Sequence, residues 1–262
     1  KWMQMLDYTI RTADSLGMQV DLTLGTGWPY GGPQVTQEFA ATKLITQTYE
    51  VPKGEKFSRH ILVMDDKEKQ TAHLQYLLAY GNKGTYIDLT PQLSGNWIDW
   101  KAQKEDFTVY AVFVGKTGQK VKRAAPGGSG FTLDHYSTHA LNAYVQPFNK
   151  ALSGFEGRIR SVFNDSYEVY GTDFTPNFFK AFEKYRGYDL KPFLPLLLSK
   201  DNNEEGNRVK SDYRETLSDL LLLDFDHPWT DWAHGKGFKS RLQAHGSPGN
   251  LIDLYASADI PE

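Results

Sequence analysis

Two pairs of carboxylates follow short runs of β-strand character, and each pair stands where its run ends. Asp165 and Glu168 follow the first run, and Asp259 and Glu262 follow the second. Two carboxyl groups on facing strand ends are the minimum that glycoside hydrolysis requires, because one protonates the leaving oxygen while the other acts from the opposite side of the sugar. The pattern therefore favours an enzyme that cuts sugar linkages.

Glu168 is the first candidate for the proton donor. A general acid needs a carboxyl group whose pKa is raised by apolar neighbours or by a second acid. Glu168 has Tyr167 and Val169 beside it and Asp165 three residues before it. The alternative is a structural carboxylate that caps the following helix or pairs with an arginine.

Glu262 is the candidate for the second carboxylate. Pro261 has no backbone N–H and should stop the preceding strand, so we expect the chain to turn there and to direct Glu262 toward the edge that carries Glu168. The alternative is a solvated terminal side chain without a function.

Polar and aromatic residues at the other predicted strand ends could hold a sugar. They are Trp28, Tyr30, Asp134, His135, Asp165, Gln243 and His245. Asp134 and His135 precede a predicted helix, where an Asp most often serves as the N-cap, so capping, sugar binding and cation binding are all open for this pair. His245 lies in a predicted loop and could donate to a hydroxyl or have a structural role.

Several other chemistries lack their motifs. The chain has no cysteine and no H-E-x-x-H spacing, so thiol chemistry and a zinc site of those kinds are not expected. The glycine-rich run 25–33 matches neither nucleotide-binding pattern, and Pro29 would break the helix start that such loops need. No G-x-S-x-G elbow is present. A calcium site needs no fixed spacing outside an EF-hand and stays open.

The composition of the 262 residues is that of a globular protein, with 40% hydrophobic and 23% charged residues. The net charge of −3 gives no field that would draw the chain to nucleic acid or to an anionic membrane. No apolar run approaches the ~20 residues that span a bilayer. The chain begins at Lys1 inside a helical pattern, so we expect a piece of a longer protein.

The hydrophobic periodicity divides the chain into three parts. Residues 1–50 carry the pattern of a helix, a strand and a glycine-rich loop, which is one unit of an α/β barrel. Residues 51–128 contain short runs rich in aromatic and β-branched residues, which indicates a β-rich insertion, expected to be antiparallel. Residues 129–262 return to alternating strands and helices. The fold expected is α/β, a partial (β/α)8 barrel of the TIM type truncated at its C-terminus; a doubly wound open sheet is the alternative.

Six short motifs occur in one order along the chain. They are Gly27-Trp28-Pro29-Tyr30-Gly31-Gly32-Pro33, Leu133-Asp134-His135-Tyr136-Ser137, Asn164-Asp165-Ser166-Tyr167-Glu168-Val169, Arg186-Gly187-Tyr188-Asp189-Leu190, Gln243-Ala244-His245-Gly246 and Ala258-Asp259-Ile260-Pro261-Glu262. Together they resemble the catalytic domain of glycoside hydrolase family 106, the α-L-rhamnosidases, over nearly the whole chain apart from residues 53–73.

The resemblance implies an inverting hydrolase on a (β/α)8 barrel, with calcium assisting sugar binding. It implies a bacterial enzyme, secreted or periplasmic, that releases terminal L-rhamnose from plant pectic polysaccharides or glycosides and that has further domains around the barrel. By position in the motifs, Glu168 resembles the general acid and Glu262 the general base. The resemblance assigns no calcium ligands here.

Other functions stay open beside this one. An inverting enzyme needs its two carboxyl groups about 6.5–9.5 Å apart, and a retaining one needs them about 5–5.5 Å apart. A non-catalytic carbohydrate-binding module would use Trp28 and Tyr30 as a stacking platform, and a structural module of a larger polysaccharide-degrading protein would need no acidic pocket.

Overall fold

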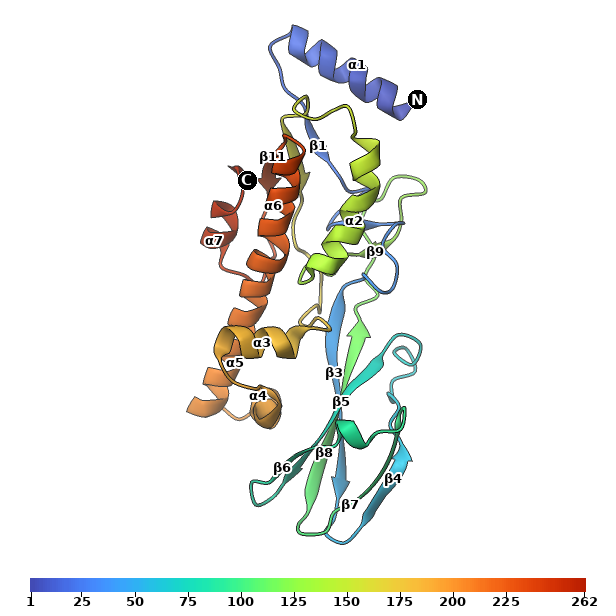
Figure 1. Ribbon diagram of the computed structural model, residues 1–262, viewed down its shortest axis with the longest axis vertical. Coiled ribbons are helices and arrows are strands. Elements are labelled where there is room, and N and C mark those ends of the chain that lie inside the picture. The colour runs from blue at the N-terminus through green and yellow to red at the C-terminus, as the bar shows by residue number, and fades with distance from the viewer. The chain divides into compact units, whose positions relative to one another are not determined.

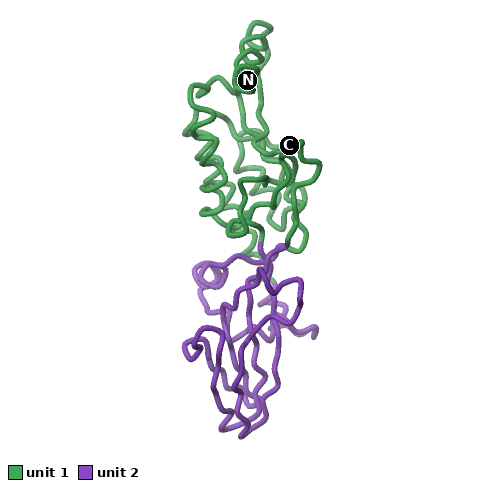
Figure 2. The backbone as a smooth tube through the Cα atoms, turned by 90° about the vertical axis from the view of Figure 1, so that its right-hand side faces the viewer, with its two compact units in different colours: residues 1–41, 118–171, 211–262 green, residues 42–117, 172–210 purple.

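The computed structural model describes all residues from 1 to 262, and they form two compact units (Figure 2). Unit 1 contains residues 1–41, 118–171 and 211–262, and unit 2 contains residues 42–117 and 172–210. Each unit is therefore assembled from segments that are distant in the sequence. The division predicted from the sequence, with boundaries at 50 and 128, remains a prediction about domains.

Unit 1 is built around an open, parallel sheet of four strands (Figure 1). In spatial order, which is also chain order, the strands are β1 (Asp21–Thr23), β10 (Ser161–Asn164), β11 (Lys239–Leu242) and β12 (Ile260–Pro261). Val162, Ser240 and Leu242 are completely buried, as expected for a sheet covered by helices. The sheet is not closed, so the fold is mixed α/β, and the partial barrel stays a prediction.

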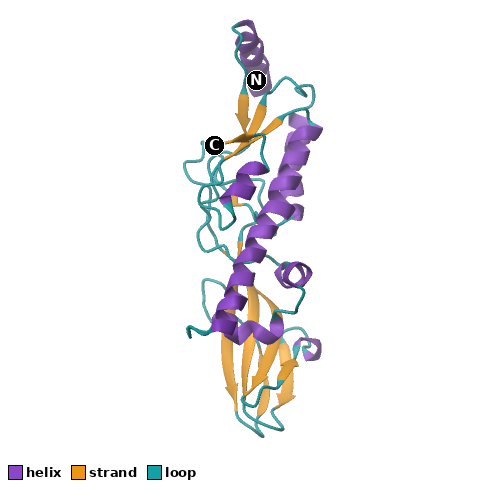
Figure 3. Cartoon of the chain, turned by 90° about the vertical axis from the view of Figure 1, so that its left-hand side faces the viewer, coloured by secondary structure: helices purple, strands orange, loops and turns teal.

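Unit 1 also contains helices (Figure 3). They are α1 (Trp2–Ser15), α2 (Thr138–Ala151), α5 (Glu204–Leu221, which begins in unit 2), the π-helical segment η3 (Leu222–Asp226), α6 (His227–Gly235) and α7 (Leu251–Ala256). The helix α6 packs on β11, and η3 contacts both α2 and α7. None of the helices combines the length and the apolar character that crossing a bilayer requires.

The helical segment that contains Pro228 does not break at this proline. Pro228 lies in the first turn of α6, directly after the π-helical turn, so the helix changes its hydrogen-bond pattern there and continues. Near the start of the part predicted to alternate strands and helices, the short strand β9 (Phe131–Thr132) pairs antiparallel with β2 (Gly31–Gly32).

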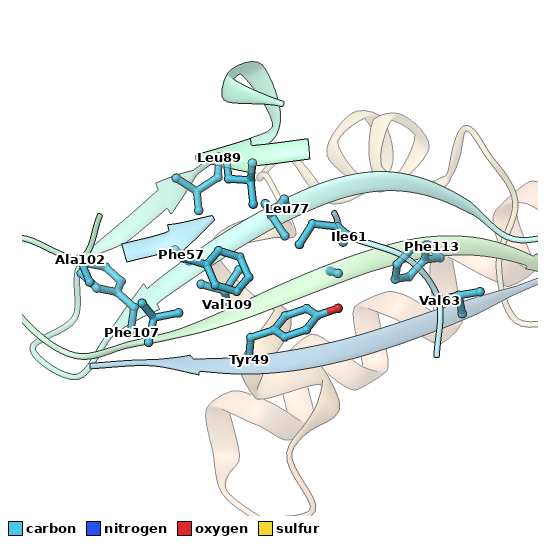
Figure 4. Packing of buried hydrophobic residues seen from close by; sticks show 14 residues of the cluster. Tyr49, Phe57, Ile61, Val63, Leu77, Leu89, Ala102, Phe107, Val109 and Phe113 are labelled. Carbon is cyan, nitrogen blue, oxygen red and sulfur yellow. The ribbon is translucent and has the colours of Figure 1, made fainter. Parts of the chain in front are cut away.

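Unit 2 is mainly antiparallel β-structure, and its strands surround one apolar core (Figure 4). One sheet has the order β3 (Thr42–Val51), β8 (Phe107–Lys116), β5 (His73–Gly81) and β6 (Tyr86–Asp88), and a second pairs β4 (Lys56–His60) with β7 (Trp97–Lys101). The core contains Leu77, Ile98 and Val109, all without exposed surface. Short helical segments complete the unit: η1 (Thr90–Gln92), α3 (Phe178–Arg186), η2 (Lys191–Phe193) and α4 (Leu194–Leu198). The antiparallel strands expected within residues 51–128 are confirmed, and β5, β6 and β8 are among them.

Candidate active site

The loops that follow β1, β10 and β11 meet at the carboxyl edge of the parallel sheet. Trp28, after β1, donates its indole N–H to Glu168 Oε2 at 3.0 Å. The backbone N–H of Tyr167, after β10, donates to the carbonyl oxygen of His245 at 2.8 Å. A Cβ added at Gly246 would lie 3.1 Å from Glu168 Cγ, so the loop after β11 runs close to Glu168. The edge therefore gathers an aromatic ring, a carboxylate and a loop histidine from three strands.

Hydrogen-bond donors surround the Glu168 carboxylate. The indole of Trp28 donates to it, and so does the Ser166 hydroxyl at 3.1 Å. These two bonds lower the pKa of Glu168, and the positive charge of Lys122 and the neighbouring His245 lower it further. The direction is opposite to the raised pKa that the sequence led us to expect of a general acid, because donors favour the ionised form.

Removal of the indole donor should shift the pKa of Glu168 and, with it, any activity that depends on this carboxyl group. Trp28→Phe keeps an aromatic ring but takes an N–H away from the ionised carboxylate, so the pKa of Glu168 should rise. If Glu168 must be protonated to act, the alkaline limb of kcat/KM moves to higher pH in the variant. Trp232→Phe is the matched control, because it removes an indole N–H that binds Asn149. An unmoved alkaline limb in Trp28→Phe would exclude Glu168 as the group that sets it.

Gly246 allows the Glu168 backbone and side chain to approach its loop. Its φ is +75°, and a Cβ at this position would lie 3.1 Å from Glu168 Cγ and 3.4 Å from its backbone nitrogen. Gly246→Ala should cost about 1–2 kcal/mol of folding free energy for the left-handed backbone and should also displace Glu168. Gly171→Ala is the control, since Gly171 has a φ of +73° with open space around it. Thermal unfolding should show similar losses in both variants, and kcat should fall only in Gly246→Ala; equal activities would contradict the contact.

Glu262 continues the ladder of β12 and is held by an arginine. The predicted turn at Pro261 is wrong, since Pro261 pairs with Leu242 and the backbone N–H of Glu262 donates to the Leu242 carbonyl at 3.0 Å. Its Oε2 accepts from Arg241 Nε at 2.5 Å. Arg241 also donates to Asp21 Oδ2 at 3.0 Å. The carboxylate of Glu262 is thus part of an ion-pair chain that joins β1, β11 and β12.

Asp21 is the second acid in this chain of ion pairs. Arg160 donates to both of its oxygens, with Nε 2.6 Å from Oδ1. This bond is the main cause that lowers the pKa of Asp21 to about 2, although partial burial opposes it. Arg241 therefore lies between two carboxylates and has one guanidinium nitrogen for each.

Three of the predicted sugar ligands are buried. Tyr30 is 4% exposed, and its hydroxyl donates to the carbonyl oxygen of Phe163 at 2.8 Å. Asp134 is also buried and accepts from the backbone N–H of Tyr136. His135 is buried too, and the loss of solvent lowers its pKa to about 3, so the ring is neutral. In this structure they lie inside the molecule, and their substrate-binding roles stay predictions.

The remaining predicted residues lie close to the edge. Asp165 and Gln243 are half-buried, with Asp165 Oδ1 bonded to the Ser166 N–H and the Gln243 N–H bonded to the Asn164 carbonyl. His245 is exposed. The structure therefore brings Trp28, Asp165 and His245 into the immediate surroundings of Glu168.

The chain matches a family defined by its sequence. The family model described as alpha-L-rhamnosidase, glycoside hydrolase family 106, covers residues 61–261. The chain belongs to glycoside hydrolase family 106. The family is one of glycosidases, and membership in it agrees with two acids and an aromatic ring on a sheet edge.

Two further proteins are similar to the chain. A Formosa agariphila protein, named as a proposed beta-glucuronidase, is 26% identical over 99% of the chain, which spans 26% of that relative. The solved structure of a rhamnosidase from Novosphingobium sp. PP1Y superposes with a TM-score of 0.84 at 15% identity, over 98% of the chain and 42% of the rhamnosidase. At this identity the likeness concerns the fold. The chain thus spans less than half the length of either protein.

Residues that the sequence did not single out complete the site of this family 106 chain. Gln119 Nε2 donates to the backbone carbonyl of Glu168 at 2.8 Å, and its Oε1 accepts from the Tyr170 N–H at 2.8 Å. Gln119 stands 49 positions before Glu168, and no local pattern marks it. Ser166 lies inside the Glu168 motif and could have been included as a donor. Arg241 carries no motif and is found only through strand pairing.

A hollow of about 320 Å³ lies away from these residues. It is lined by α1, by residues 18–20 before β1 and by residues 157–160 before β10, which is the amino side of the sheet. Its three arginines are all in ion pairs: Arg11 and Arg158 with Asp7, and Arg160 with Asp21. Because active sites of α/β enzymes lie at the carboxyl edge, we assign the site to the Glu168 loops and not to this hollow.

Proposed function

We propose that the full-length protein is an inverting α-L-rhamnosidase in which Glu168 is the general acid and Glu262 the general base. The observation that carries the proposal is the position of Glu168 beside Trp28 at the carboxyl edge of a parallel sheet, in a chain of family 106. Glu262 follows the fourth strand of the same sheet, so both carboxylates belong to one edge.

The reaction uses the two acids on opposite sides of the sugar ring. Glu168 donates its proton to the glycosidic oxygen as the bond to the anomeric carbon breaks, and Glu262 takes a proton from the water that forms the new bond. Glu168 ends ionised and Glu262 ends protonated, and exchange with solvent restores both. A carboxyl separation of about 6.5–9.5 Å would leave room for the water.

Glu168 must be protonated before it can donate, although its pKa is lowered in the free protein. A bound sugar would displace water from the carboxyl group and could engage the indole N–H of Trp28. Both changes favour the neutral acid. The substrate therefore supplies part of the environment that a general acid requires.

Arg241 prepares Glu262 for its role. Its guanidinium holds one oxygen of the carboxylate at 2.5 Å through a charge-assisted hydrogen bond. The second oxygen is then the one available to a water molecule.

The surroundings of Glu168 offer groups for a rhamnose ring. The Trp28 ring supplies an apolar surface for the 6-deoxy methyl group. Asp165, Gln243 and His245 supply hydrogen-bonding groups for the ring hydroxyls. Tyr30, Asp134 and His135 are buried and would support the site from below. Plant pectic polysaccharides or glycosides are the proposed source of the rhamnose.

The proposal includes a (β/α)8 barrel that further residues of the full-length protein complete. Its support is the strand order, which follows the chain order without the reversal that a doubly wound sheet has at its switch point. A secreted or periplasmic location is also part of the proposal. Calcium is the proposed cation, but it has no assigned ligands, because no group of three or more His, Asp or Glu side chains is arranged to hold a metal ion.

The test is hydrolysis by the full-length protein. We expect it to cleave p-nitrophenyl α-L-rhamnoside, and proton NMR should show β-L-rhamnose as the first product. The α-anomer as first product would establish retention and overturn the inverting mechanism. Binding of rhamnosides without hydrolysis would support the non-catalytic carbohydrate-binding function instead.

A second candidate substrate is a glucuronide, in line with the name of the Formosa protein. Two cations favour it: Lys122, whose charge acts on Glu168, and Arg123, whose guanidinium carbon lies 5.3 Å from the centre of the Trp28 ring. Either could pair with a sugar carboxylate. Comparison of p-nitrophenyl β-D-glucuronide with the rhamnoside under the same conditions decides between the two substrates.

A further inference from the structure

Tyr167, the residue before Glu168, is held both by its backbone and by its side-chain hydroxyl. Tyr167 is 3% exposed, and its backbone N–H donates to the His245 carbonyl at 2.8 Å. Its hydroxyl accepts from Asn164 Nδ2 at 2.9 Å and donates to Asp226 Oδ1 through a short hydrogen bond. A backbone hydrogen bond and side-chain hydrogen bonds therefore both hold the peptide that leads into Glu168.

Asp226 is an unusual partner for this tyrosine. It has no exposed surface and is the last residue of the π-helical segment η3. Its Oδ2 has no hydrogen-bond partner among the protein atoms. Phe225 and His135 pack their rings against Tyr167, with centroids 6.1 and 5.2 Å away. Such π-helical turns are frequent at functional sites, and this one places an acid beneath the site.

Burial favours the neutral form of Asp226. Burial raises its pKa to about 8, although the bond from Tyr167 opposes the rise. A buried carboxylate with one unpartnered oxygen would carry a large desolvation cost, and the neutral acid avoids it. The role of Asp226 toward Tyr167 is thus that of a hydrogen-bond acceptor, which a neutral amide can also fill.

We propose that Asp226 is a positioning residue for Glu168 and acts through Tyr167, a proposal that rests on the proposed general-acid role of Glu168. The Tyr167–Asp226 bond prevents rotation of the chain that carries Glu168. The carboxyl group then stays beside Trp28 and Ser166, where proton transfer requires it. A misplacement of about 1 Å can cost about 10²-fold in rate, so a distant anchor can have a large effect.

The test compares two leaving groups in variants of the full-length protein. A 2,4-dinitrophenyl rhamnoside needs almost no protonation on departure, whereas a methyl rhamnoside depends on the general acid. Asp226→Leu and Tyr167→Phe should lower kcat at least about 10-fold on the methyl rhamnoside and less than about 3-fold on the dinitrophenyl rhamnoside. Asp226→Asn should stay within about 3-fold of the wild type on both, because its amide oxygen still accepts the bond.

Thr216→Val is the matched control. Thr216 is completely buried on α5 and bonds to the Asp212 carbonyl, so the variant loses a buried hydrogen bond without touching Tyr167. It should leave the ratio of the two rates unchanged. Equal losses on both substrates in Asp226→Leu and Tyr167→Phe, or no loss on either, would overturn the positioning role.

A crystal structure of Tyr167→Phe separates this proposal from the proposed function. If the wild-type protein cleaves no rhamnoside, the proposed function fails, and the position of Glu168 still decides the inference. Loss of the 3.0 Å bond between Trp28 Nε1 and Glu168 Oε2 in the variant supports the positioning role, and its retention overturns it. Tyr167→Phe suits this purpose because it keeps the ring and removes one hydroxyl.

Discussion

Glu168→Gln in the full-length protein should lower kcat about 10²–10⁴-fold on a rhamnoside with a poor leaving group, with little change in KM. Glutamine has nearly the same shape and still accepts from Trp28 and Ser166, so the position of the side chain is kept. It has no acidic proton, so the leaving oxygen must depart as an anion. Steady-state kinetics on the methyl and dinitrophenyl rhamnosides measures the effect.

The size of the loss should depend on the leaving group. On the dinitrophenyl rhamnoside the variant should be close to the wild type, because that phenolate departs unaided. Glu205→Gln, on an exposed carboxylate of α5, controls for the loss of a negative charge. Near-normal turnover of the methyl rhamnoside by Glu168→Gln would remove this residue from the mechanism.

Glu262→Gln should lower kcat by a similar factor of about 10²–10⁴, but to the same extent for both leaving groups. The reason is that a water molecule must lose its proton in either reaction, whatever group departs. Substrate binding should persist, because Arg241 can still donate to the amide oxygen and keep the side chain in place. The same pair of substrates therefore distinguishes the base from the acid.

A reversed pattern would exchange the two roles. If Glu262→Gln spares the dinitrophenyl rhamnoside and Glu168→Gln does not, Glu262 is the acid. Asp259→Asn is the control for damage to β12, because Asp259 binds His234 and the backbone N–H of Ser240. That variant should lower the melting temperature and leave the dependence on the leaving group unchanged.

The residues that the sequence could identify are those whose role is local. Glu168 follows the apolar run that becomes β10, so its place at a strand end could be predicted from neighbouring residues alone. The helix at the chain start has regular apolar spacing and ends before Gly17, and α1 confirms it. The antiparallel strands of unit 2 are separated by turn residues in the same local way.

Long-range contacts could not be predicted in this way. Asp226 reaches Tyr167 from 59 positions away, and Arg241 reaches Asp21 from 220 positions away. Neither pair has a sequence pattern, since any buried acid or half-buried arginine looks the same along the chain. Tyr30 shows the opposite difficulty: an aromatic residue next to a glycine-rich loop suits a sugar platform and a core equally well, and here it is buried.

The way in which each unit is assembled from separate segments of the chain has a consequence for the order of folding. In unit 2 the main sheet forms between strands within residues 42–117, whereas in unit 1 β1 must find β10, whose paired residues lie 140 positions further along the chain. Loop-closure entropy makes such distant pairings slow. During synthesis the antiparallel sheet can form while β11 and β12 are still to be made. The strand β1, which leads to Trp28, therefore pairs only after its neighbour β10 has been made. The edge that carries Glu168 is among the last parts of the chain to assemble.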